Sequence, residues 1–371
     1  MLHTTKHFFT VKEPDTSSVD IYREVLDATD RDNIRTVLSI GPQSIRFLSE
    51  RFPPVQNSAD LDALAERLSS TYRECEYGCS LLFCPTLIDA SCRRGIFPMA
   101  IKLTGNHFMY APKLHKRRSL TQLQPPVKGF PMSSDENEGK FLLSRFHVSK
   151  KFLRDRNETT RAVSFDLFIN RKEDLAPVFS LIRRQHGENW LCHALRLCFV
   201  HMFLNADDYF TKIVIVAIRR HCYFTDTYKE EDDKTDCMHS NVDDNRLVEE
   251  GDLVAAEIGY IVGDIYTSAT GAYSVGGAGT LQLAATGVAM QSVGCKLWDL
   301  GMYMEYKDEM LGCVSIPRGS WIKLVREHTS NSTVTENIYR LLCEKYSGGV
   351  PVRELLLKSE STKRQRVEGI A

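Results

Sequence analysis

The sequence predicts an α+β fold in which helices flank a mixed β-sheet, and the stretch from residue 249 to 318 carries most of that prediction. An apolar run over 253–262, a Gly263-Asp264 turn and further strand-forming residues over 265–267 indicate a hairpin. Apolar residues at helical spacing over 281–288 then predict a helix, and residues 296–301 predict a short strand. Strand, strand, helix and strand form half of a small α/β unit, so we expect its site at the strand ends.

A Gly-rich loop, Gly276 to Gly279, precedes the predicted helix, and Thr280 is its candidate N-cap. Backbone N–H groups at a helix N-terminus can hold an anion. The loop resembles that of the GNAT acetyltransferases, which hold the pyrophosphate of coenzyme A between a strand and a helix. A plain tight turn explains the same glycines, so both interpretations stay open.

Length and composition indicate a globular protein with room for two or more domains. The chain has 371 residues, of which 43% are hydrophobic and 26% are charged, with a net charge of −1. No apolar window is long enough for a membrane span, and the first residues lack the apolar segment of a signal peptide. The odd number of cysteines, 11, then favours reduced thiols, and we expect a cytoplasmic protein.

Composition shifts along the chain predict four parts. These are an N-terminal arm (1–35), a smaller N-terminal α/β domain (36–140), a larger domain (141–347) and a C-terminal tail (348–371). Residues 222–248 are acidic and poor in apolar side chains, which predicts an insertion between two strands.

Patterns outside the central stretch predict further elements. Helices are expected over 37–52, 61–72, 174–185, 190–203, 321–326 and 334–346, and strands over 141–146, 162–169 and 211–218.

Cationic side chains gather in three segments. Clustered cations can neutralise phosphates, although solvated surface faces explain the same runs. The candidates for contact with a nucleic acid are Arg93, Arg94, Lys113, Lys116, Arg117, Lys150, Lys151 and Arg154.

One carboxylate, Asp299, lies in the predicted strand between Trp298 and Leu300. Burying a charge is costly, so such a group either is satisfied structurally by backbone amides or orients an amine in a site. The carboxylates that follow, Glu305, Asp308 and Glu309, could hold a cationic acceptor or simply face solvent. The aromatic residues Phe97, Trp190 and Tyr266 either line an apolar pocket or fill a core.

Several short motifs, in order, resemble the leucyl/phenylalanyl-tRNA–protein transferases. Residues 93–98, Arg-Arg-Gly-Ile-Phe-Pro, are similar to the family's RRGIFPW signature. Residues 147–150 resemble its H-I-S-R/K segment, residues 296–299 its L-I-D strand, and residues 316–318 its I-P-R segment. The resemblance covers residues 81–325, with insertions at about 122–140 and 222–248.

The resemblance implies a GNAT-like larger domain and a divergent, eukaryotic-type member. It implies an enzyme that moves Leu, Phe or Met from an aminoacyl-tRNA to the α-amine of an acceptor protein with a basic N-terminal residue, without a cofactor or metal. Asp299 then matches the site aspartate that supports attack by the amine, while Trp190, Phe97, Met99 and Tyr266 match or adjoin the aminoacyl pocket. Lys150, Lys151 and Arg154 fall in a basic helix facing the tRNA.

The chain departs from the family at polar positions. The family's glutamine after the site aspartate is absent, since Leu300 and Gly301 follow Asp299. The family's C-G-E-S glutamate is also absent after Tyr266. An acyl-CoA N-acyltransferase that uses Gly276 to Gly279, and a non-catalytic tRNA- or degron-binding protein, therefore remain alternatives.

Overall fold

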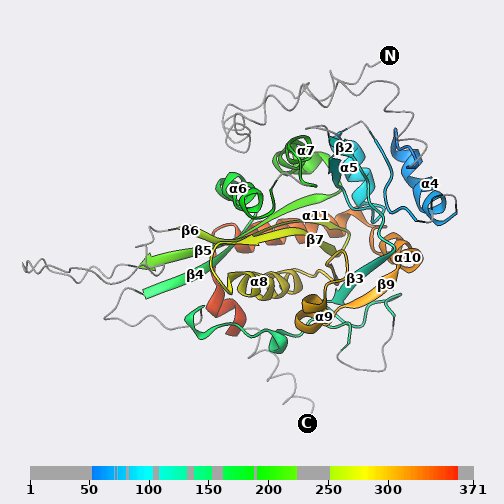
Figure 1. Ribbon diagram of the computed structural model, residues 1–371. Helices are drawn as coiled ribbons and strands as arrows, with labels where there is room; N and C mark the ends of the chain where they lie inside the picture. The colour runs from blue at the N-terminus through cyan, green and yellow to red at the C-terminus, as the bar shows by residue number, and fades with distance from the viewer. Residues whose placement is uncertain are drawn as a thin grey trace, which may run out of the picture.

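The computed structural model describes residues 52–70, 72, 74–80, 83–102, 108–131, 138–152, 162–187, 190–223 and 251–357. Within them the chain is α+β, with a large mixed sheet flanked by helices (Figure 1). The sheet order is β10-β4-β5-β6-β7-β8-β3-β9. Its strands are β3 (Arg117–Gln122), β4 (Ala162–Ile169), β5 (Lys212–Tyr223), β6 (Asp252–Val262), β7 (Ile265–Tyr273), β8 (Leu297–Asp299), β9 (Val314–Pro317) and β10 (Val350–Pro351).

The centre of the sheet is the meander β5-β6-β7, and it confirms the predicted hairpin. β6 and β7 pair antiparallel from Val262↔Ile265 outwards. The turn needs glycine at 263, because its φ is 64° and a Cβ there would lie 1.9 Å from the carbonyl oxygen of His328. Tertiary packing against the C-terminal end of helix α10 (Arg318–His328) therefore adds to the turn preference of the local sequence.

Helices cover both faces of the sheet, and successive side chains of β5 point alternately into the two cores. Ile213, Ile215 and Ala217 join the core under α6 (Leu175–His186) and α7 (His193–Leu204). Val214, Val216 and Ile218 join the core under α8 (Ala278–Ser292) and α11 (Ser332–Tyr346). A strand buried on both faces reads as a continuous apolar run, as the sequence of β5 does.

The crossover β7-α8-β8 makes the only parallel pairing among the described strands, and it is short. Three residue pairs join β7 to β8, ending at Thr267↔Asp299. β7 continues to Tyr273 while the chain leaves β8 after Asp299, so the two strands part. The parting leaves room for a site between them.

The N-terminal part packs onto the α6–α7 face. It holds α4 (Ser58–Ser69), α5 (Pro85–Cys92) and a small sheet of β1 (Ala100–Lys102) and β2 (Phe108–Tyr110). Side chains of α4 and α5 share one core with α6, α7 and α10. The described residues of the N-terminal part and of the main sheet therefore contribute to one hydrophobic core on this face.

One predicted element is corrected: residues 141–146 do not form a strand but hold a 3-10 helix, η1 (Leu143–Arg145). Two strands of the main sheet come from outside the predicted larger domain (141–347). β3 lies between β8 and β9, and β10 pairs with β4.

Some predictions fall outside the described residues. These are the arm 1–35, nearly all of the helix 37–52, Arg154, most of the insertion 222–248 and the tail after residue 357. In the described part of the chain, no helix combines the length and apolar character needed to cross a membrane.

Candidate functional site

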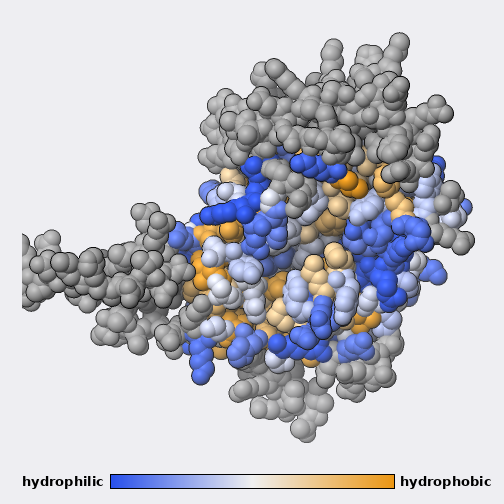
Figure 2. Space-filling view, in the orientation of Figure 1, coloured by the Kyte–Doolittle hydropathy of each residue, from blue (hydrophilic) through white to orange (hydrophobic). Residues whose placement is uncertain are grey.

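A cavity of about 830 Å³ opens where β7 and β8 part. Figure 2 shows this face of the molecule hollowed, with apolar side chains at the edge of the hollow. The lining comes from the N-terminal part, α6, β6, β7, α8 and the segment from β8 to α9 (Glu305–Leu311). Its principal side chains are Phe97, Met99, Lys113, His115, Gln185, His186, Trp190, Glu257, Ser268, Tyr273, Gln282, Met302, Met304, Tyr306 and Lys307.

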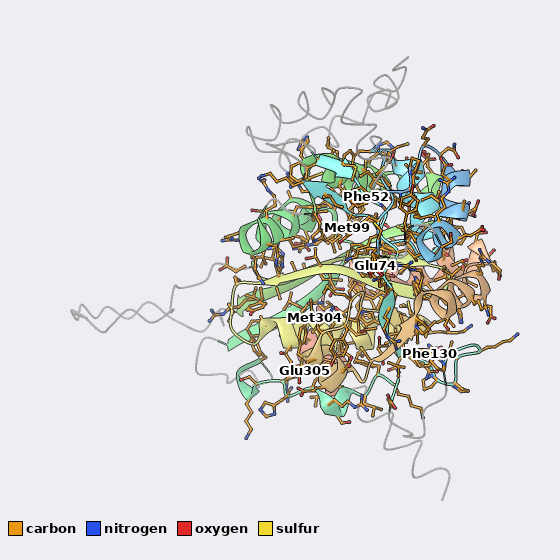
Figure 3. The ribbon with its side chains drawn as sticks, turned by 45° about the vertical axis from the view of Figure 1, so that its right-hand side comes forward. Phe52, Glu74, Met99, Phe130, Met304 and Glu305 are labelled. Atoms are coloured by element: carbon orange, nitrogen blue, oxygen red, sulfur yellow. The ribbon has the colours of Figure 1, made fainter. Side chains whose placement is uncertain are left out.

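One wall of the cavity is apolar and comes from three backbone segments held together. The rings of Phe97 and Trp190 lie 5.2 Å apart between centroids. The amide of Ala100 donates to the carbonyl of Trp190 at 2.9 Å, and the amide of Ala111 donates to the carbonyl of Met99 at 2.8 Å. In Figure 3, Met99 and Met304 lie on opposite sides of the yellow strands. The predicted pocket residues Phe97, Met99 and Trp190 therefore do meet in one cavity.

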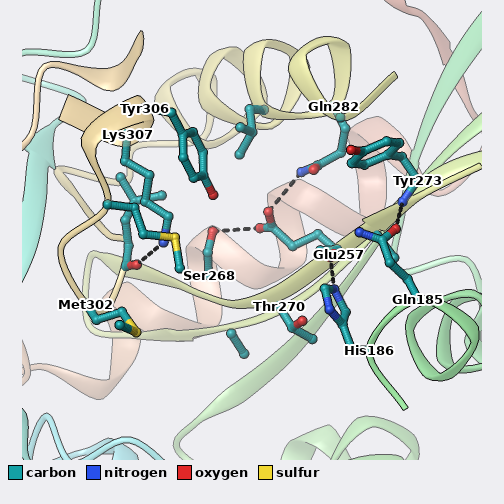
Figure 4. A pocket seen from close by; sticks show the side chains of 18 of the residues that line it. Gln185, His186, Glu257, Ser268, Thr270, Tyr273, Gln282, Met302, Tyr306 and Lys307 are labelled. Carbon is teal, nitrogen blue, oxygen red and sulfur yellow. Dashed lines mark hydrogen bonds between the residues drawn. The ribbon is translucent and has the colours of Figure 1, made fainter. Parts of the chain in front are cut away.

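A buried carboxylate, Glu257 of β6, also lines the cavity. Ser268 Oγ donates to its Oε1 at 2.8 Å and Gln282 Nε2 to its Oε2 at 2.9 Å (Figure 4). The Tyr266 hydroxyl donates as well. Burial raises the pKa of Glu257, and these hydrogen bonds oppose the rise. Neighbours on β7 and α8 thus hold the carboxylate in place.

Sequence reasoning missed Glu257. Its only local signal is one carboxylate in the middle of the apolar run 253–262. In the sheet, Glu257 lies beside the segment that follows Tyr266, since it pairs with Gly271 of β7.

A lysine faces the same cavity. Lys307 projects from α9, and its Nζ donates to the Leu300 carbonyl at 2.6 Å (Figure 4). Burial lowers the pKa of Lys307. The cavity therefore offers both an anionic and a cationic group beside its apolar wall.

Asp299 does not line the cavity, which corrects its predicted place against the acceptor amine. Its carboxylate is fully buried, and Arg118 of β3 holds it from two nitrogens, with Arg118 Nε 3.0 Å from Oδ1. Thr267 Oγ1 and the amide of Gly301 each donate to it at 3.0 Å. These donors occupy the carboxylate, so a substrate amine has no direct access to it.

Tyr266 is also misplaced by the prediction. Its ring is fully buried, 6.1 Å from that of Trp298 between centroids, and it does not line the cavity. Its hydroxyl donates a hydrogen bond to the carboxylate of Glu257. Tyr273, at the far end of β7, contributes the aromatic ring at the cavity mouth.

The glycine loop reaches the cavity, although its cap differs from the prediction. Gly277, not Thr280, is the N-cap of α8, and it has a left-handed φ of 85°. Gly277 and Gly279 both line the cavity, so the N-terminal end of α8 faces it.

A second groove, of about 590 Å³, adjoins the cavity, and the two share Lys113, His115 and Met302. Lys116, Arg117 and the exposed ring of Tyr303 line the groove further out. The groove therefore combines cations and an aromatic ring with one carboxylate, that of Glu76.

Most of the predicted cations have protein partners. Lys113 pairs with Glu76, Lys116 with Glu74, and Arg94 with Asp62. Arg117 donates to Ser315, and the Arg93 guanidinium lies 4.7 Å from the centroid of Phe210. Lys150 is exposed in the 3-10 helix η2 (Lys150–Phe152), which also contains Lys151. Of the predicted cations whose side chains are described, Lys113, Lys116 and Arg117 lie together beside the cavity.

Neither the models of known protein families nor the curated protein sequences match this chain. Among the residues with described positions, no three His, Cys, Asp or Glu side chains form a group that could hold a metal ion.

Proposed function

We propose that the protein is an aminoacyltransferase that moves an apolar amino acid (Leu, Phe or Met) from an aminoacyl-tRNA to the α-amine of an acceptor protein, as in N-degron tagging. The observation that carries the proposal is the pairing of two features in one cavity: the apolar wall of Phe97, Met99 and Trp190, and the buried carboxylate of Glu257. An aminoacyl group needs the apolar wall for its side chain and the carboxylate for its α-amine. The parted strands beside the N-terminus of α8 support a GNAT-like arrangement of this half of the molecule.

The reaction itself is mild, because an aminoacyl ester is already activated. The acceptor nitrogen attacks the ester carbonyl, the bond to the ribose oxygen breaks, and a proton passes from the attacking nitrogen to that oxygen. The protein mainly has to hold both substrates and stabilise the oxyanion. Glu257 is assigned to the amine of the donor, and the apolar wall to its side chain.

The second groove supports a nucleic acid as the donor's carrier. Lys113, Lys116 and Arg117 can neutralise phosphates, and Tyr303 offers a ring for base stacking. Because the groove shares residues with the cavity, a single-stranded 3′ end in the groove would present its ester to the cavity. The protein is then expected in the cytoplasm, where charged tRNA is available.

Acidic residues beside the cavity mouth support a basic acceptor. Glu305 and Glu309 are exposed on α9, the helix that brings Tyr306 and Lys307 to the cavity. A peptide that begins with Arg or Lys would find negative charge there.

The test is transfer of labelled leucine from leucyl-tRNA to a peptide beginning with Arg, with arginyl-, glutaminyl- and aspartyl-tRNA as competitors. Leucyl-, methionyl- and phenylalanyl-tRNA should all donate, because methionine-lined pockets discriminate weakly and one methylene changes binding by only about 1–3 kcal/mol. A clear preference for arginyl-tRNA would overturn the proposal.

A variant pair sharpens this test. Glu257→Gln should lower transfer about 10- to 100-fold, because the amine loses a charged hydrogen-bond partner. Glu344→Gln removes a carboxylate whose partner is Arg340 on the surface of α11, and should leave transfer unchanged. Equal activity of the two variants would remove the role given to Glu257.

An acyl-CoA-dependent N-acyltransferase is the second candidate, favoured by the position of Gly277 and Gly279 in the cavity lining. Replacing charged tRNA with acetyl-CoA in the same assay decides between the two donors. Binding of leucyl-tRNA without transfer to any peptide would instead support a non-catalytic binding protein.

A further inference from the structure

A buried chain of polar contacts runs from β8 through β3 to the wall of the cavity. Asp299 holds the Arg118 guanidinium, and Arg118 Nη1 lies 2.8 Å from Nδ1 of His115. All three side chains are buried, yet His115 lines both the cavity and the adjoining groove. This series of polar contacts therefore ends on an imidazole at the junction of the two hollows.

The chemistry of arginine decides the state of that imidazole. A guanidinium is always charged and only donates hydrogen bonds. Nδ1 of His115 must therefore accept, which leaves the single ring proton of the neutral imidazole on Nε2. Among the described residues, none hydrogen-bonds Nε2, and Nε2 is not sealed from solvent. It lies across the ring from the atom that contacts Arg118, and His115 lines both hollows.

The charges around the ring also favour the neutral imidazole. Arg118 of β3, Lys113, Lys307 of α9 and Arg318 of α10 surround it, while the nearby carboxylates of Asp299 and Glu76 are already paired with Arg118 and Lys113. Burial, followed by the charge of Arg118, lowers the pKa of His115 to about 2. A second proton is thus disfavoured throughout the physiological range.

We infer that the Asp299–Arg118 pair locks His115 as a neutral imidazole with its N–H on Nε2, a fixed hydrogen-bond donor for a carbonyl oxygen bound in the cavity. The lock itself follows from the geometry alone. The identity of the oxygen rests on the proposed function: it is the carbonyl oxygen of the aminoacyl ester, which gains negative charge when the acceptor nitrogen attacks. A neutral donor that is already oriented stabilises such charge without reorganisation. Asp299 then acts as a positioning residue through Arg118.

The lock is tested without any substrate. The full-length protein is labelled with ¹⁵N-histidine, and its ring signals are followed from pH 5.5 to 8, with His115 assigned from the signal that disappears in His115→Gln. We expect shifts of a neutral ring protonated on Nε2 that do not change over this range. Titration near pH 6.5, the ordinary histidine value, or protonation of Nδ1 would overturn the inference.

The donor role is tested by transfer kinetics. His115→Ala should lower kcat about 100- to 1,000-fold, as loss of one oxyanion donor does. His115→Gln should recover part of that loss, since its amide can both accept from Arg118 and donate to a ligand. His201→Gln, on α7 outside the cavity lining, serves as the control and should transfer normally. Full activity of His115→Ala would overturn the donor role. Absence of transfer in the unaltered protein would refute the proposed function and leave the NMR result standing.

Discussion

At the residue scale, the site depends on ionisable groups that the fold keeps out of bulk water. Glu257 and His115 reach the cavity, whereas Asp299 and Arg118 lie behind it. Burying a charged or polar group is tolerated only with a partner, and each of these groups has one. Substitutions here therefore affect stability and chemistry together, and the two must be measured separately.

Asp299→Ala should destabilise the fold by about 3–5 kcal/mol, because it leaves the Arg118 guanidinium buried without a counter-charge. Urea denaturation followed by circular dichroism measures the change. The double variant Arg118→Met/Asp299→Leu removes both charges and should lose less stability than Asp299→Ala alone. Asp299→Ala with unchanged stability would mean that the pair contributes nothing to the fold.

Glu257→Gln tests the buried carboxylate through pH. Burial raises the folded-state pKa of Glu257 above its unfolded value of about 4.3, so the folded state binds this proton more readily than the unfolded state. The free energy of unfolding of the unaltered protein, relative to Glu257→Gln, should therefore decrease as pH rises from 4.3 through the raised pKa. Denaturation of both proteins at pH 5 and pH 7 measures it. A difference that does not vary with pH would contradict the raised pKa.

At the element scale, the short parallel pairing of β7 and β8 makes the opening, and α8 closes one side of it. The pairing stops at Thr267↔Asp299, and the helix begins at Ala278, directly after its N-cap Gly277. Gly277 adopts a left-handed conformation, which residues with a Cβ rarely adopt. The start of α8 is thus a position where backbone geometry, rather than side-chain chemistry, shapes the cavity.

Gly277→Ala should destabilise the protein by about 1–2 kcal/mol, the cost of a left-handed conformation for an L-residue. The added Cβ would also lie 3.2 Å from the ring of Phe152. Gly276→Ala is the matched control, because a Cβ there meets nothing within 4 Å. Thermal unfolding of the two variants provides the comparison, and equal melting temperatures would show that the conformation of Gly277 is not constraining.

At the scale of the whole molecule, the cavity and groove form where the N-terminal part meets the main sheet. Phe97 and Lys113 exchange backbone hydrogen bonds of 2.8 Å, which places the apolar wall next to the cations of the groove. Trp190 and Tyr303 come from distant parts of the chain. Both substrates of the proposed reaction would therefore contact residues from both parts.

Lys116→Glu should weaken tRNA binding and flatten the log–log dependence of affinity on salt by about one unit, because one phosphate contact is lost. Arg340→Glu is the control, since Arg340 sits in a comparable surface ion pair, on α11, outside the groove. Filter binding over a range of salt concentrations measures both. If Lys116→Glu and Arg340→Glu behave alike, the groove does not hold the tRNA.

The local sequence determined the elements around the site. The turn at Gly263, the strands β5, β6 and β7 and the helix α8 follow from patterns with a period of two or 3.6 residues and from turn chemistry, and the structure confirms them. These elements depend on neighbours in sequence. The common pocket of Phe97, Met99 and Trp190 was implied only by the family resemblance, and all three residues line the cavity.

Only the tertiary structure decided which polar groups face the cavity. The cation of Arg118 is buried because β3 inserts beside β8 and pairs Leu120 with Asp299. The same pairing makes Asp299, predicted to contact the substrate amine, a buried counter-ion. The β6–β7 register brings Glu257 beside Gly271, in the segment that follows Tyr266. In a sheet, a shift of one residue moves a side chain to the opposite face. Strand order and register join residues far apart in the chain, so no local pattern in the sequence specifies them.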